Sequence, residues 1–223
     1  MARYGLAPSI LSADFGHLAE DVARVEKYAT HLHVDAMDGH FVPPITIGPV
    51  VVQALRAATD LPLECHLMVT DPLAQTEQFA EAGATSVVVH LEAAPDPSKV
   101  IERARRLRIG VGISINPETP LDAALPYLER IDVLNIMTVN PGWAGQAFLA
   151  EMLPKIGAAR EAIDARGLGI ALAVDGGIGL ETGKQALEAG ATVLGAASAI
   201  FKAPDPADAA RALSELVASY ADG

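Results

Sequence analysis

The chain has 223 residues and a formal net charge of −12; 20% of its residues are charged, 51% are hydrophobic, and Cys65 is the one cysteine. So apolar a composition excludes disorder driven by low hydropathy, and the length suits one large domain. The excess of negative charge argues against nucleic acid or an anionic membrane surface as a partner.

No apolar run reaches the roughly 18 residues that a membrane span needs, and Met1–Tyr4 leads into a strand-like segment instead of a signal peptide. A lone cysteine cannot form an internal disulfide, which agrees with a reducing compartment. We therefore expect a cytoplasmic protein that does not enter a membrane.

Short β-branched runs alternate along the chain with stretches of helical period. We expect strands near Leu6–Ile10, Leu32–Asp35, Leu63–Leu67, Ser86–His90, Ile109–Ile113, Val133–Met137, Ile170–Val174 and Val193–Leu194. We expect helices near Phe15–Tyr28, Pro49–Ala58, Pro72–Ala82, Pro97–Leu107, Leu121–Ile131, Pro154–Arg166, Thr182–Ala189 and Pro206–Tyr220.

Several helix boundaries carry their own signals. An aspartate followed by proline, the pattern of an N-cap and a first helical residue, occurs at Asp71, Asp96 and Asp205. Gly83 and Gly190 fall where a helix commonly ends in a left-handed residue. The repeating unit is therefore a strand, a loop, a helix and a tight return.

Eight such units at a mean spacing of about 28 residues indicate a single (β/α)8 barrel spanning residues 1–223. An open doubly wound sheet has the same alternation, and periodicity alone does not separate the two folds. No Gly-x-Gly-x-x-Gly follows the first expected strand. No linker or low-complexity tract divides the chain.

Polar side chains cluster where the expected strands end, which is where a barrel carries its chemistry. His33, Asp35 and Met37 alternate and so share one face of an extended segment, and His66 and Met68 repeat the pattern. The histidines and aspartates among these residues, together with Asp175, offer two imidazoles and two carboxylates to one divalent cation. Such a set suits zinc, iron(II) or manganese more than calcium.

Each of these residues also has a purely structural interpretation. A lone histidine on an apolar strand is more often a hydrogen-bonded core residue than a ligand, but buried carboxylates are costly without a metal or hydrogen bonds, which favours the site. We interpret Met37, Met68 and Met137 as an apolar floor. His17, His31 and His40 are interpreted as surface or loop residues.

Glycine-bearing turns follow the last three expected strands. They are Pro141–Gln146, Asp175–Gly177 and Gly195–Ser198. Barrels commonly hold a phosphate at the loops after strands seven and eight, and small residues let backbone N–H groups approach an anion. One such turn is weak evidence, since glycine is the ordinary turn residue, but together the turns favour a phosphorylated ligand.

These motifs together resemble the ribulose-phosphate 3-epimerase family. The resemblance rests on Ala7–Asp14, His33–Pro43 with Ile45–Pro49, His66–Met68, Met137–Gly142 and Val174–Gly177, and it extends in order from residue 4 to about residue 201. It implies a metal-dependent (β/α)8 barrel that interconverts ribulose 5-phosphate and xylulose 5-phosphate, a reaction of the pentose phosphate pathway.

The resemblance also implies the roles of individual residues. His33, Asp35, His66 and Asp175 would bind one divalent metal ion (zinc, iron(II), manganese or cobalt), and Asp35 and Asp175 would be the catalytic acid and base. The residues that would contact substrate or phosphate are Ser9, His66, Gly142, Trp143, Ala144, Gly145, Asp175, Gly176, Gly177, Ala197 and Ser198. The metal would act as a Lewis acid that stabilises a cis-enediolate.

Some positions depart from the family pattern. Trp143 and Ala144 stand where the phosphate loop commonly has Phe and Gly, Ala197 replaces a usual Gly, and Pro44 an Asn. An alanine is compatible with phosphate binding if its φ is negative. Relatives in the superfamily act on hexulose phosphates, so an allulose 6-phosphate 3-epimerase is the alternative.

Two further alternatives stay open at this stage. In a non-catalytic phospho-sugar-binding barrel, paired acid and base carboxylates would have no role. A phosphate-binding barrel of tryptophan or thiamine-type pathways would not require His33, Asp35 and His66. We expect a small-molecule sugar phosphate as ligand and a homo-oligomer; the alanine-rich helix faces are compatible with subunit packing but are not diagnostic of it.

Overall fold

The structure, a computed structural model, describes residues 4–221. Within this range the chain forms eight parallel strands in one sheet, in the order β1-β8-β7-β6-β5-β4-β3-β2. The strands are β1 (Gly5–Pro8), β2 (Leu32–Met37), β3 (Leu63–Met68), β4 (Ser86–His90), β5 (Gly110–Ile115), β6 (Val133–Met137), β7 (Ala171–Asp175) and β8 (Val193–Ala196). A parallel bridge between Ser9 and His33 joins the two ends of the sheet. The expected (β/α)8 barrel is confirmed.

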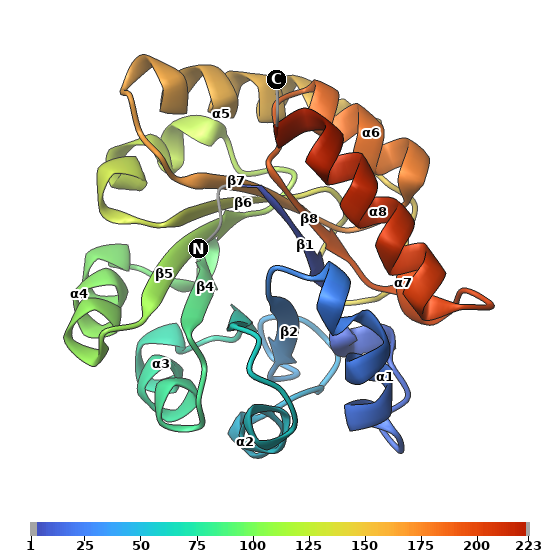
Figure 1. Cartoon of the computed structure of the whole chain (residues 1–223). Coiled ribbons are helices and arrows are strands. Elements are labelled where there is room, and N and C mark those ends of the chain that lie inside the picture. The colour runs from blue at the N-terminus through green and yellow to red at the C-terminus, as the bar shows by residue number, and fades with distance from the viewer. Residues whose placement is uncertain (1–3, 222–223) are drawn as a thin grey trace.

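The α-helices lie around the outside of the strands (Figure 1). They are α1 (Leu18–Val25), α2 (Pro49–Ala58), α3 (Pro72–Glu81), α4 (Pro97–Leu107), α5 (Leu153–Ala165), α6 (Leu180–Glu188), α7 (Ser198–Phe201) and α8 (Pro206–Ala221). Short 3₁₀ helices are η1 (Ile10–Ser12), η2 (Glu26–Tyr28), η3 (Leu91–Ala93), η4 (Leu121–Ala123), η5 (Leu125–Arg130) and η6 (Ala150–Met152). No helix among residues 4–221 is both long enough and apolar enough to cross a membrane.

The expected helix boundaries are mostly found. The Asp71 carboxylate accepts a hydrogen bond from the Ala74 N–H at 3.1 Å, and Asp205 accepts one from Ala207 at 2.9 Å. Asp96 precedes α4 but makes no such side-chain bond. Gly83 and Gly190 have φ values of 108° and 107°, a region that favours glycine. These residues therefore end their helices as the sequence predicts.

Two helix predictions were wrong in detail. The run Leu121–Ile131 does not form one α-helix but the two 3₁₀ helices η4 and η5, because Pro126 lacks an N–H and its ring would clash with the preceding turn of an α-helix. The run Phe15–Tyr28 becomes α-helical only from Leu18, and its last three residues form η2.

Alternate residues of the strands face two different environments. Apolar residues such as Leu32, Val34 and Cys65 pack into the large core between the sheet and the helices. The intervening residues point to the barrel interior, where a small apolar cluster gathers at one end: Ala7, Val133, Ala171, Ala173 and Val193. Toward the carboxyl ends, the same alternation places Ser9, Asn135 and Asp175 inside the barrel, and Ser9 and Asp175 belong to the site described next.

Candidate functional site

Four ionisable side chains meet inside the barrel. Only Asp175 is the last residue of its strand; the expectation that all four lie at strand ends was wrong, because β2 and β3 continue to Met37 and Met68. His33 and Asp35 come from β2, His66 from β3 and Asp175 from β7. The Nε2 atom of His33 lies 3.2 Å from Asp35 Oδ1 and 3.6 Å from Asp175 Oδ2. The Nδ1 atom of His66 lies 3.2 Å and 3.4 Å from the same two oxygens. The structure thus brings together the four residues that the sequence singled out as ligands, with one donor atom of each within 4.8 Å of the others.

The chemistry of this cluster fits a divalent cation. Imidazole nitrogen and carboxylate oxygen are ligands of zinc and similar first-row metals. Burial alone would lower the pKa of His33, yet Asp35 and Asp175 raise that pKa well above its ordinary value. The two carboxylates therefore draw positive charge into a buried site. A divalent ion held by two neutral imidazoles would balance their two negative charges.

Both aspartates are held ionised. Burial alone would raise the pKa of Asp35, but the charge on His33 and hydrogen bonds from His33 and His66 lower it below the usual range. For Asp175, burial and the neighbouring Asp35 raise the pKa, while the same two histidines produce a net lowering. Asp35 is also fixed by Ser9, whose hydroxyl donates to Oδ2 at 2.5 Å.

A second layer of buried residues, which the predicted ligand set did not include, contacts the cluster. Glu64 Oε1 lies 2.9 Å from His33 Nδ1, and His90 Nε2 lies 2.8 Å from His66 Nε2. Glu64 carried a signal in the sequence, because a carboxylate on an apolar strand two residues before His66 shares its inward face. His31 was wrongly assigned to the surface: it is 3% exposed, and its Nε2 lies 3.7 Å from Glu64 Oε1.

His90 connects the cluster to Glu92. Burial lowers the pKa of His90 to about 4, so the ring is neutral near pH 7. Burial alone would raise the pKa of Glu92, but the neighbouring His90 and hydrogen bonds from Thr119 and the Asn116 backbone lower it to about 2. Glu92 is therefore a carboxylate at the end of a line of side chains that begins at His66.

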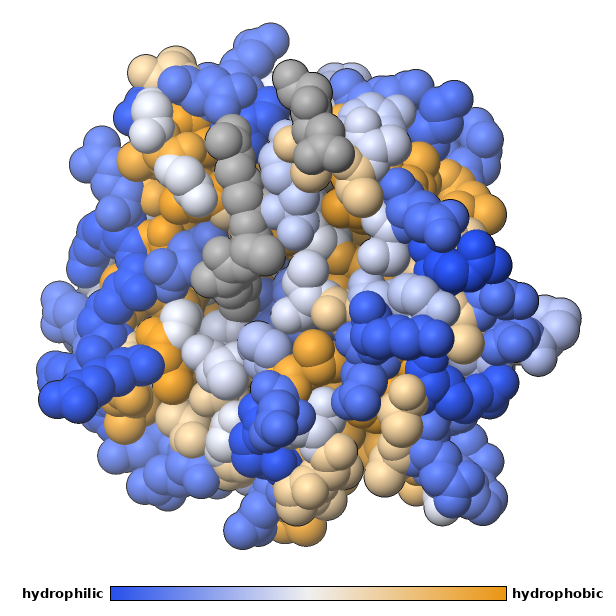
Figure 2. Space-filling model, in the orientation of Figure 1, coloured by the Kyte–Doolittle hydropathy of each residue, from blue (hydrophilic) through white to orange (hydrophobic). Residues whose placement is uncertain are grey.

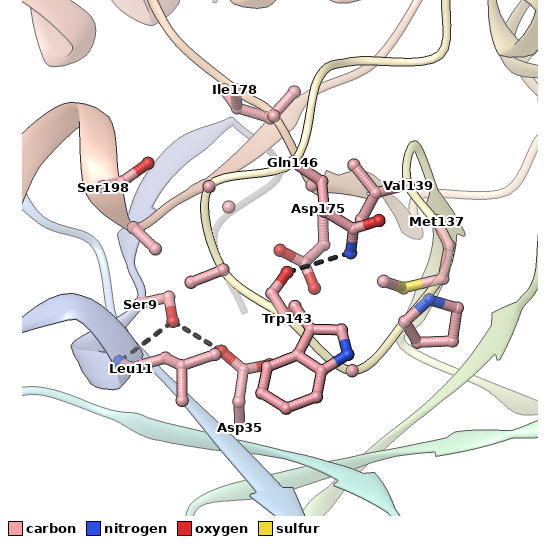
Figure 3. A pocket seen from close by; sticks show the side chains of 18 of the residues that line it. Ser9, Leu11, Asp35, Met137, Val139, Trp143, Gln146, Asp175, Ile178 and Ser198 are labelled. Atoms are coloured by element: carbon pink, nitrogen blue, oxygen red, sulfur yellow. Dashed lines mark hydrogen bonds between the residues drawn. The ribbon is translucent and has the colours of Figure 1, made fainter. Parts of the chain in front are cut away.

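A pocket opens above the cluster and is lined by most of the expected substrate residues. These are Ser9, Gly142, Trp143, Ala144, Gly145, Asp175, Gly176, Gly177, Ala197 and Ser198. Asp35 and the three methionines Met37, Met68 and Met137 line it too, whereas His66 is fully buried beneath it. Leu11, Val139, Pro141, Gln146, Ile178 and Gly195 complete the lining. Asp35 and Asp175 point into this space from different strands (Figure 3).

The glycine turns bring backbone close to the pocket. Gly176 and Gly177 have φ values of 116° and 68°, and a Cβ on Gly177 would lie 2.5 Å from the Phe148 nitrogen. Ala197 has a φ of −107° and precedes α7, so its methyl group imposes no backbone strain there. No lysine or arginine lines the pocket among residues 4–221. Any anion bound here would be held by uncharged donors.

Two further residues brace the mouth of the barrel. The Thr46 hydroxyl donates to the Asp35 carbonyl at 2.6 Å and accepts from the Met37 N–H at 3.0 Å. The Asp38 carboxylate accepts hydrogen bonds from Thr70, Phe41 and His40, which lower its pKa to about 2 although burial raises it. The loops after β2 and β3 are thereby tied together.

Comparison with known proteins identifies the family. Residues 5–201 match the model of the ribulose-phosphate 3-epimerase family. The chain belongs to this family. A ribulose-phosphate 3-epimerase of Mycobacterium tuberculosis is 47% identical over 208 residues, covering 93% of this chain and 90% of that protein. The one from Bacillus subtilis is 42% identical over 213 residues, covering 95% and 97%.

Membership of the ribulose-phosphate 3-epimerase family makes the chain an enzyme, an isomerase that acts on carbohydrates. Solved structures share its fold. A 3-hexulose-6-phosphate synthase has a TM-score of 0.70 at 23% identity and covers 95% of this chain and 97% of its own. KGPDC from Streptococcus mutans has a TM-score of 0.76 at 16% identity, with coverage of 98% and 99%.

Proposed function

We propose that the pocket above the four-residue cluster inverts C3 of a pentulose phosphate, interconverting D-ribulose 5-phosphate and D-xylulose 5-phosphate as a step of the pentose phosphate pathway. The observation that carries the proposal is that two ionised aspartates, Asp35 and Asp175, share one cavity with a buried set of metal donors. A binding protein would need the cavity but not this pair of carboxylates.

Epimerisation next to a ketone removes a proton from one face of the carbon and returns a proton to the other. Asp35 and Asp175 reach the cavity from β2 and β7, and each has one oxygen in the donor cluster. Their second oxygens lie outside the donor cluster and would carry the proton transfer. Ser9 orients Asp35 Oδ2 for this role through its hydrogen bond.

His33, His66, Asp35 and Asp175 would hold one divalent ion, zinc, iron(II), manganese or cobalt. When bound, this ion supplies Lewis-acid stabilisation of the negative charge that develops on the substrate as the proton leaves. An aspartate with a lowered pKa is a weak base for a C–H proton, so the reaction depends on that stabilisation.

The remaining pocket residues bind and shield the substrate. Met37, Met68 and Met137 form an apolar floor that limits water near the reacting carbon. The phosphate would accept hydrogen bonds from backbone N–H groups of Gly176, Gly177 and the turn at Ala197–Ser198. The loop from Gly142 to Gly145, which carries the exposed Trp143, would cover it.

Steady-state turnover of ribulose 5-phosphate, measured before and after chelation, tests this function. We expect turnover that is lost with chelator and restored by added zinc, iron(II), manganese or cobalt. Allulose 6-phosphate is the matched competitor substrate and should turn over at a lower kcat/KM. Full activity without bound metal would refute the Lewis-acid role, and a preference for allulose 6-phosphate would refute the pentulose assignment.

A further inference from the structure

The contact between His66 and His90 has the distance of a hydrogen bond. The two Nε2 atoms are 2.8 Å apart, the ring planes differ by 15°, and the ring centroids are 4.9 Å apart. At this distance an N–H of one ring meets the lone pair of the other. Both side chains are fully buried, so water does not compete for this bond.

The protons on the two rings follow from the ligand geometry. A neutral imidazole carries one N–H, on one of its two nitrogens. If His66 offers the lone pair of Nδ1 to a metal, its proton sits on Nε2 and is donated to His90. His90 Nε2 then accepts, which leaves its own proton on Nδ1. That nitrogen lies 3.4 Å from Glu92 Oε2, which is its nearest acidic oxygen, and it has no hydrogen-bond partner among residues 4–221.

Glu92 is fixed so that one oxygen remains for His90. Its Oε1 accepts a hydrogen bond from the Asn116 N–H at 2.8 Å and another from the Thr119 hydroxyl. The loop that carries these donors is itself held by Lys155, whose ammonium donates to the carbonyls of Pro117 and Thr119 at 2.6 Å and 2.8 Å. Oε2 therefore faces His90 without a second side-chain or backbone partner among the described residues.

We propose that His90 and Glu92 are positioning residues that hold His66 in the tautomer whose Nδ1 accepts a metal. The proposal rests on the metal site of the proposed function. In the other tautomer His66 would point an N–H from Nδ1 at Asp35 Oδ1, 3.2 Å away, and would close the site with an internal hydrogen bond. The Glu92 carboxylate opposes that state because it requires the proton of His90 on Nδ1.

The series of contacts that orients the other histidine of the cluster, His33, is shorter. Glu64 contacts His33 Nδ1 directly, at 2.9 Å, so a carboxylate fixes that ring in one step. His66 has no carboxylate on its outer nitrogen, and His90 carries the preference of Glu92 across one additional ring. Outer contacts of this kind orient metal-binding histidines, and their loss typically reduces metal affinity 10- to 100-fold.

Cobalt binding, followed by the visible absorption of bound Co²⁺, measures the effect without reference to activity. His90→Leu keeps an apolar side chain in the buried position but cannot accept the proton of His66. His90→Gln places a carbonyl oxygen where it can accept. Glu92→Gln keeps the shape of a side chain that is 24% exposed, but its single carbonyl oxygen cannot serve both His90 and the Asn116–Thr119 pair.

We expect His90→Leu to weaken cobalt binding by about 10- to 100-fold, Glu92→Gln to weaken it by about tenfold, and His90→Gln to restore most of the affinity. Thr76→Val is the control, because it removes a buried hydroxyl that bonds only to Pro72 within α3. It should leave cobalt affinity unchanged. Thermal unfolding of each metal-free variant shows whether the chain has folded.

Nitrogen NMR of the zinc-loaded wild-type protein, labelled with ¹⁵N-histidine, reads the tautomers directly and needs no variant. We expect the proton of His66 on Nε2 and that of His90 on Nδ1. The reverse assignment overturns the proposal, as does equal cobalt affinity in wild type, His90→Leu and Glu92→Gln. If the wild-type protein binds neither cobalt nor zinc, the metal site of the proposed function is refuted. That result differs from one in which wild type and variants bind cobalt equally, which refutes only the role of His90 and Glu92.

Discussion

Asp35 and Asp175 have different surroundings although they belong to one donor cluster. The side chain of Asp35 is 5% exposed and is held by Ser9, whereas that of Asp175 is 15% exposed and faces the pocket. Asp175 also follows directly into the Gly176–Gly177 turn. The two carboxylates are therefore suited to work from different sides of one substrate.

Asp35→Asn and Asp175→Asn should each reduce epimerisation at least 100-fold, because each removes one acid or base, a contribution of about 10²- to 10⁴-fold. A variant that retains one carboxylate should still exchange the C3 proton of one epimer with D₂O. The measurement is turnover alongside deuterium incorporation by NMR.

Cobalt occupancy is the control for this pair of variants, since each also removes a metal donor. Rates should be compared at concentrations of cobalt that saturate both proteins. Turnover near the wild-type rate in either saturated variant would contradict the two-carboxylate scheme.

At the scale of elements, the strands could be predicted because their signal is local. Ser86–His90 and Val133–Met137 form strands with the predicted limits. Three valines fill the first strand between Ser86 and His90, and the second is an apolar run bounded by Asp132 and Thr138. The prediction of one α-helix over Leu121–Ile131 was wrong. The apolar residues of this run have helical spacing, but Pro126 prevents an α-helix there.

The sequence predicts which site residues share a face of one strand, because side chains alternate along a strand. His33 with Asp35, and His66 alone, could be placed on inward faces from their spacing. The partners across strands could not, because they depend on register: β2 pairs with β3 so that His33 lies opposite Glu64. The contact between His66 and His90 similarly requires knowing how β3 and β4 are aligned.

The turn between β7 and α6 sets the position of the pocket wall. Gly177→Ala would bring a methyl carbon to 2.5 Å from the Phe148 nitrogen and 2.7 Å from its Cα, so the backbone of the preceding loop must move. We expect KM for the sugar phosphate to rise at least tenfold, or about 1.4 kcal/mol. Steady-state kinetics and thermal unfolding check this.

Gly145→Ala is the matched variant for that experiment. Gly145 also has a positive φ, 80°, but a Cβ there would meet nothing within 4 Å. It therefore carries the backbone strain of about 1–2 kcal/mol without the collision. Equal rises in KM for the two variants would show that strain, and not the contact with Phe148, governs the pocket.

At the scale of the whole molecule, closure of the barrel and formation of the site coincide. The sheet is joined between its first and last members by the bridge from Ser9 to His33. Both residues belong to the site, Ser9 through its bond to Asp35 and His33 as a member of the buried cluster that could hold a metal. Positioning of the proposed catalytic groups therefore depends on the same contact that completes the barrel.

Most of the charged side chains of the molecule lie on its surface, away from the pocket. Hydrophilic residues dominate the outer rim of the face in Figure 2, with apolar residues between them. Most ion pairs involve exposed side chains, such as Lys184 with Glu188 and Arg211 with Asp208, and exposed pairs contribute little to stability. The net charge of −12 thus describes the surface and serves solubility.

Added salt should therefore not weaken substrate binding. In a site built on lysine or arginine, by contrast, added salt would weaken it. A molecule of charge −12 repels a sugar phosphate, and no cationic side chain among residues 4–221 lines the pocket to offset this. Raising ionic strength from 0.01 M to 0.15 M shortens the screening length from about 30 Å to about 8 Å. KM should then fall or stay constant.

Ala144→Lys provides the comparison, because Ala144 is an exposed residue of the pocket lining and a lysine there would add a screened attraction. For this variant KM should be lower than in wild type at low salt and should rise as salt is added. A wild-type KM that rises with salt would mean that a cationic side chain reaches the phosphate when substrate binds. In that case backbone N–H groups would not account for recognition by themselves.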